Sequence, residues 1–100
     1  MDISTQLNQG VARIKLNGRF TFDKHLAFNV ALKKQLNDDC RMIEIDFGQV
    51  DYLDSYGLGL LLLARDRAIA LRKDIALINC RGRVKSILGT ANFKKLFTIS

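Results

Sequence analysis

The sequence predicts an α/β fold in which a mixed β-sheet and its helices form one domain. Two kinds of segment support this: stretches that alternate apolar and charged residues at period 2, and stretches of helical spacing that lie between them. The chain has 100 residues, a length that supports one hydrophobic core but not two. Because no Pro-, Ser- or Gly-rich tract marks a linker, we expect residues 1–100 to form a single domain.

The first third of the chain predicts a strand pair and a helix. Residues 11–16 alternate apolar and charged side chains, as a half-buried strand does, and residues 3–7 would pair with them through a turn at Asn8-Gln9-Gly10. Asp23 is the predicted N-cap of an amphipathic helix that extends to about Asn37.

The remainder predicts a strand-helix-strand unit. Residues 42–47 alternate again, and residues 75–79 form a compact apolar strand. The segment between them is long enough for a crossover helix, which implies parallel pairing by a right-handed connection. A short helix over residues 84–91 and an extended piece over residues 97–99 complete the prediction.

Composition argues against several classes of function. The most apolar run, Leu58 to Ala64, is far shorter than the roughly 20 residues that span a bilayer, and the start of the chain has no export signal. We therefore expect a cytoplasmic protein without membrane insertion. Cys40 and Cys80 are predicted to be reduced and structural. His25 is the only histidine, which argues against a metal cluster or a Ser-His-Asp triad.

The net charge of +6 is concentrated in the second half, where nine basic residues between positions 65 and 95 face only Asp66 and Asp74. Such a surface suits nucleic acid, anionic lipid or an acidic protein. Only Phe93 and Phe97 lie near the basic residues, so direct nucleic-acid binding is not expected. Solvated side chains on helix faces are the simpler interpretation, and an acidic partner surface is the hypothesis kept beside it.

A polar turn, Asp54-Ser55-Tyr56-Gly57-Leu58-Gly59, opens the second predicted helix. Asp54 or Ser55 would be its N-cap. Gly57 and Gly59 each cost the helix roughly 1 kcal/mol relative to alanine, so we expect a reason for them: a close approach by another backbone or a phosphate, with Ser55 left unobstructed. As the start of a dinucleotide fingerprint the pair is weak, because Leu62 occupies the third glycine's position. We expect no enzymatic activity and no cofactor.

The leucines after this turn separate into two stripes by helical phase. The stripe predicted to face the sheet holds Leu60, Leu63, Ala64, Ala68 and Leu71. The second stripe is apolar only near the helix start and holds Leu58, Leu61, Leu62 and Ile69. Either it is a docking patch or neighbouring helices bury it.

A phosphate on Ser55 would add roughly −1.5 to −2 charges beside the free N–H groups at the positive end of the helix dipole. The host helix should tolerate this group. A partner packed on Leu58 and Leu62 would have to bury a doubly charged group or lose contact. Asp54 would orient the hydroxyl, interact with a kinase or simply cap the helix.

Asp54 to Gly59, the strand before it, Leu16-Asn17-Gly18-Arg19-Phe20 and residues 93–97 resemble STAS domains, specifically the anti-sigma factor antagonists of bacterial partner-switching pathways. The resemblance covers nearly the whole chain. It implies the STAS fold, with helices mainly on one side of a mixed sheet. It also implies phosphorylation of Ser55. The partner contacts that it implies are Asp54, Tyr56, Gly57, Leu58, Gly59, Leu62, Thr21 and Asp23.

The resemblance further implies competition between partners. The unphosphorylated antagonist, a monomer when free, binds an anti-sigma factor that is a serine kinase of the histidine-kinase ATPase type; phosphorylation weakens the complex, and a PP2C-type phosphatase restores it. The alternative is a STAS accessory subunit of a lipid-transport ATPase, or another STAS-type interaction module. Three features depart from the family: Tyr56 replaces a small residue, Thr21 stands where an aspartate is frequent, and the usual final helix is absent before Ser100.

Overall fold

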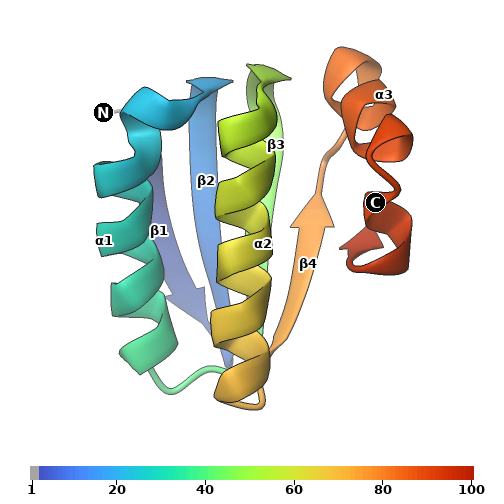
Figure 1. Ribbon diagram of the computed structural model, residues 1–100. Coiled ribbons are helices and arrows are strands. Elements are labelled where there is room, and N and C mark those ends of the chain that lie inside the picture. The colour runs from blue at the N-terminus through green and yellow to red at the C-terminus, as the bar shows by residue number, and fades with distance from the viewer. Residues whose placement is uncertain (1–2) are drawn as a thin grey trace.

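The computed structural model describes residues 3–100, which form a five-stranded mixed sheet with α1 and α2 side by side across one face (Figure 1). The elements are β1 (Ile3–Asn8), β2 (Val11–Phe20), the 3₁₀ helix η1 (Phe22–Lys24), α1 (His25–Asn37), β3 (Met42–Leu53), α2 (Ser55–Ala70), β4 (Asp74–Ile78), α3 (Gly82–Thr90), the 3₁₀ helix η2 (Phe93–Lys95) and β5 (Thr98–Ile99). The predicted α/β class, mixed sheet and one-sided helix packing are confirmed.

The strands follow one another in sequence order across the sheet. β1 and β2 are antiparallel and meet in a two-residue turn, in which Gln9 and Gly10 both have positive φ. The other neighbouring pairs, β2 with β3, β3 with β4 and β4 with β5, are parallel. The strand-helix-strand prediction around α2 is therefore confirmed.

The core lies between the sheet and the two long helices. Ile14 of β2 and Ile45 of β3 are fully buried on the helix side of the sheet. Phe28 of α1 packs there too, with its ring edge against Phe20 at a centroid distance of 5.0 Å. α2 contributes the fully buried Ala64, among other residues. Small side chains at this contact let the helix axis lie close to the sheet.

Two predicted strands are longer than the alternating patterns indicate. β2 continues to Phe20, and β3 continues to Leu53 through a register shift opposite residues 15–19. The carboxylate of Asp46 accepts hydrogen bonds from the Gly48 N–H (2.8 Å) and the Asn79 side chain (3.0 Å) at this irregularity. The alternation is interrupted there, so the sequence pattern ends before the strand does.

The prediction that Asp23 is the N-cap of the first helix is wrong. Asp23 lies inside η1, and α1 begins two residues later at His25, with Lys24 at the N-cap position. The Lys24 N–H donates to the Thr21 carbonyl at 2.9 Å. This tight turn carries the chain past Asp23 before the α-helix starts.

The predicted core stripe of α2 is correct for Ala64 and Ala68, which are fully buried, and wrong for its leucines. Leu63 and Leu71 are exposed and Leu60 is half-buried, whereas Leu61, assigned to the other stripe, is fully buried. The residues that face the sheet are Gly57, Leu61, Ala64 and Ala68.

Cys40 and Cys80 are free and buried, as predicted. No helix within residues 3–100 combines the length and the apolar character that a membrane crossing requires.

Candidate functional site

The site is built at the first turn of α2, and Asp54 closes that turn. Asp54 has extended backbone angles, and its Oδ1 accepts a hydrogen bond from the Gly57 N–H at 2.8 Å. Asp54 is therefore the N-cap, which was one of the three roles considered for it. Ser55 is the first helical residue and is exposed. Its hydroxyl is not needed to cap the helix, because Asp54 does so.

Gly57 is required by the packing of the chain on itself. A Cβ atom at this position would lie 2.3 Å from the carbonyl oxygen of Phe20 and 3.2 Å from its ring. The close approach of another backbone, expected from the sequence, is thus made by the end of β2. This contact fixes the rotation of α2 and explains why Leu61, four residues later, points into the core.

Gly59 has a different environment. It is exposed, and a Cβ added to it would meet no heavy atom of residues 3–100 within 4 Å. The fold does not require a glycine here, although glycine weakens a helix. Gly59 leaves the outer surface of the first turn bare beside Ser55.

Leu58 and Leu62, the apolar residues expected to bind a partner, differ in exposure. Leu58 is half-buried and packs against the core, so much of its side chain supports the fold. Leu62 is 37% exposed. Of the two, Leu62 presents more apolar surface to a binding partner.

Three rings, which we call the aromatic cluster, lie next to the helix start: Phe22 and Tyr56, which are exposed, and His25, which is half-buried. The Tyr56 ring, 62% exposed, lies 5.2 Å from Phe22, which is 54% exposed. Phe22 stacks on His25 at 4.4 Å. Sequence reasoning missed Phe22 and His25 as site residues. The available signal was the parallel pairing of β2 with β3, which brings the two strand ends together.

Thr21 and Asp23, the more distant residues of the predicted site, belong to the same region because they flank Phe22. The Thr21 hydroxyl donates to Oδ1 of Asp23. This hydrogen bond, helped by nearby Lys24, holds the pKa of Asp23 below its ordinary value. Asp23 is exposed, so it presents a carboxylate beside the aromatic cluster.

The charge pattern of the first turn suits a phosphate better than an acid-base reaction. The N–H groups that begin α2 and the helix dipole both favour an anion at this end. Asp54 already uses one of these N–H groups. Within the described residues, no group of three or more His, Cys, Asp or Glu side chains is placed to hold a metal ion.

The chain resembles known proteins over nearly its whole length. Residues 3–98 match the sequence model of a family described as "Mlab, STAS domain". A STAS-domain containing protein of Pseudomonas aeruginosa is 40% identical over 87 residues, which cover 87% of this chain and 85% of that protein.

Solved structures share the fold at low sequence identity. An anti-sigma factor antagonist from Mycobacterium paratuberculosis superposes with a TM-score of 0.85 at 18% identity, covering 97% of this chain and 82% of that chain. The anti-sigma factor antagonist SpoIIAA in its unphosphorylated form gives 0.76 at 15% identity, covering 98% and 86%. A structure of SpoIIAA in its phosphorylated form, from Bacillus, gives 0.66 at 14% identity, covering 98% and 90%.

Proposed function

The chain belongs to the STAS-domain family, and on that premise we propose that it is an anti-sigma factor antagonist switched by phosphorylation of Ser55. Unphosphorylated, it binds an anti-sigma factor that is also a serine kinase, and phosphorylation releases it. The protein is a ligand and a substrate in this cycle and performs no catalysis itself. It acts in the cytoplasm, and it is a monomer when free.

One observation carries the proposal: Ser55 is exposed at the first position of α2 while Asp54 performs the capping. A hydroxyl in this place is accessible to a kinase and dispensable to the helix. A phosphate there meets the positive end of the helix dipole, so the domain stays folded.

The interface that the phosphate would disrupt is the surface around the first turn. Gly59 leaves it bare, Leu62 supplies exposed apolar area, and Tyr56 of the aromatic cluster flanks the hydroxyl. A partner seated there would have to desolvate the new dianion, which costs more than a neutral hydroxyl. A PP2C-type phosphatase would remove the phosphate and restore binding.

The decisive experiment uses a serine kinase of the histidine-kinase ATPase type from the organism that encodes this chain. Incubation with that kinase and ATP should add one phosphate to the wild-type chain and none to Ser55→Ala, measured by intact mass. Ser86→Ala is the matched control, because Ser86 is also exposed on a helix. Unchanged labelling of Ser55→Ala would refute the assignment.

The binding half of the proposal is tested with Ser55→Asp. We expect weaker kinase binding by calorimetry, with a free energy of unfolding within about 1 kcal/mol of wild type, as for other surface changes. Equal affinities of Ser55→Asp and wild type would contradict the switch. An unmodified chain that copurifies with an ATPase of a lipid transporter would support the alternative, a STAS accessory subunit.

A further inference from the structure

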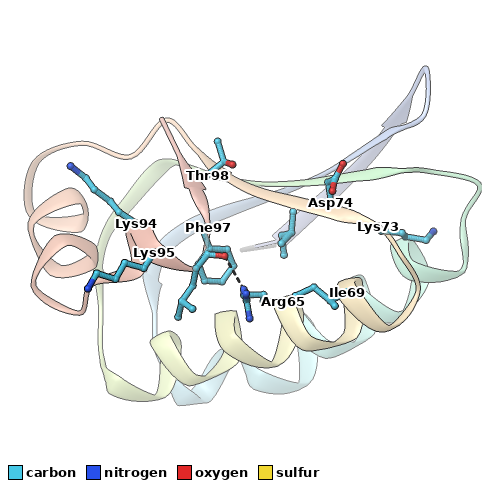
Figure 2. A pocket seen from close by; sticks show the side chains of 10 residues that line it. Arg65, Ile69, Lys73, Asp74, Lys94, Lys95, Phe97 and Thr98 are labelled. Atoms are coloured by element: carbon cyan, nitrogen blue, oxygen red, sulfur yellow. Dashed lines mark hydrogen bonds between the residues drawn. The ribbon is translucent and has the colours of Figure 1, made fainter.

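A second surface lies on the side of α2 away from α1, between this helix and the segment that follows α3 (Figures 1 and 2). It is a hollow of about 360 Å³, and we call it the basic groove. Its lining residues are Arg65, Ile69, Lys73, Asp74, Ile75, Lys94, Lys95, Leu96, Phe97 and Thr98. The described residues place one carboxylate, Asp74, among four cationic side chains in this lining.

Three of these four cations are available to a ligand. Lys73 is not among them, because its ammonium donates to the Asp38 carbonyl at 2.7 Å. Arg65 is held in place by its Nε–H, which donates to the Leu96 carbonyl at 2.8 Å (Figure 2). Lys94 and Lys95 extend outward from η2. Within residues 3–100, none of these three pairs with a carboxylate.

The groove also exposes apolar surface between its charges. Ile69 of α2 is 52% exposed, and Leu96, which follows η2, is 38% exposed. An apolar side chain entering between them would be removed from water while carboxylates reach the cations at the rim. A purely ionic ligand would leave this apolar area unused.

We propose that the basic groove binds an acidic segment of a partner protein, whose carboxylates pair with Arg65, Lys94 and Lys95 and whose apolar side chains contact Ile69 and Leu96. The pre-set guanidinium of Arg65 suits a carboxylate because its fork of N–H donors matches two oxygens. The complementary charge sets the class of ligand, and the exposed side chains of Ile69 and Leu96 favour a protein over a polyphosphate.

Nucleic acid fits the groove less well. Single strands rely on exposed aromatic side chains for base stacking. The two aromatic residues of this segment, Phe93 and Phe97, stack on each other at 5.4 Å and are both buried in the core. Neither ring is open to a base.

The groove is independent of the proposed switch at Ser55. Arg65 lies ten residues beyond Ser55 along α2, about 15 Å at the helical rise. A surface phosphate at that distance is screened, since the Debye length is about 8 Å at physiological salt. Acidic-segment binding should therefore be equal in Ser55→Ala and Ser55→Asp, whatever the kinase experiment gives.

The test uses a fluorescein-labelled synthetic peptide built from Glu and Leu at helical spacing, and fluorescence anisotropy at low salt. A peptide with every Glu replaced by Gln is the control ligand, and it should bind at least about tenfold more weakly if charge complementarity operates. Added salt should weaken the Glu peptide. Absence of binding by the Glu peptide would overturn the proposal.

Two double variants locate the site. Lys94→Glu/Lys95→Glu should reduce peptide affinity about tenfold or more, as expected for reversal of two interfacial charges. Lys33→Glu/Lys34→Glu, on exposed positions of α1, changes the net charge equally and should have little effect. Equal losses in the two variants would show general attraction, not a groove. Tighter binding of a DNA oligonucleotide than of the peptide, lost in the first variant, would reassign the groove to nucleic acid.

Discussion

At the scale of single residues, the two glycines of the α2 start have opposite physical roles. Gly57 accommodates the Phe20 carbonyl oxygen, which leaves no room for a Cβ atom. A Cβ atom at Gly59 would meet open space, so glycine weakens the helix at this position although the packing does not require it. The fold therefore explains the first glycine, and the proposed partner surface explains the second.

Alanine at each position should separate these roles. Gly57→Ala should lower the free energy of unfolding by about 1–3 kcal/mol or more, because backbone must move to admit the methyl group. Gly59→Ala should raise it by up to about 1 kcal/mol through helix propensity. Urea unfolding followed by circular dichroism measures both. A loss of stability in Gly59→Ala would show that this position is constrained after all.

At the scale of elements, the rotation of α2 decides which leucines belong to the core. The sequence offers two plausible stripes, because apolar residues surround the helix almost completely from Leu58 to Ala64. Periodicity alone cannot choose between them. The contact of Gly57 with Phe20, 37 positions earlier, makes the choice. This is a tertiary contact, so no local pattern contains it.

Neighbouring leucines test this rotation directly. Leu61→Ala should cost about 2–5 kcal/mol of unfolding free energy, as is usual for a fully buried leucine. Leu62→Ala should cost about 1 kcal/mol or less, since its side chain is partly in water. Chemical denaturation of the two variants gives the difference. A larger loss in Leu62→Ala than in Leu61→Ala would contradict this rotation of α2. In the proposed switch, Leu62→Ala should also weaken kinase binding.

At the scale of the whole molecule, much of the architecture follows from the sequence and the fine placement of the site does not. The hairpin, the parallel crossover and the cap near Asp54 were predictable because each depends on residues close in sequence. Asp23 failed as an N-cap because a 3₁₀ turn intervenes. Phe22 was missed because it meets Tyr56 only after β2 and β3 have paired.

The aromatic cluster therefore depends on the complete sheet, and a double-mutant cycle can measure this dependence. The rings of Phe22 and Tyr56 connect segments from the two halves of the chain. In a cycle of Phe22→Ala and Tyr56→Ala, we expect their contact to give a coupling of about 0.5–1 kcal/mol in unfolding free energy. Leu63→Ala replaces Tyr56→Ala in the control cycle, because Leu63 is exposed on the same helix, and that pair should be additive within about 0.3–0.5 kcal/mol. Additivity of Phe22→Ala with Tyr56→Ala would mean that the rings do not hold the start of α1 against α2. In that case a partner at Ser55 would meet two separate side chains, and the cluster could not act as one surface in the proposed interface.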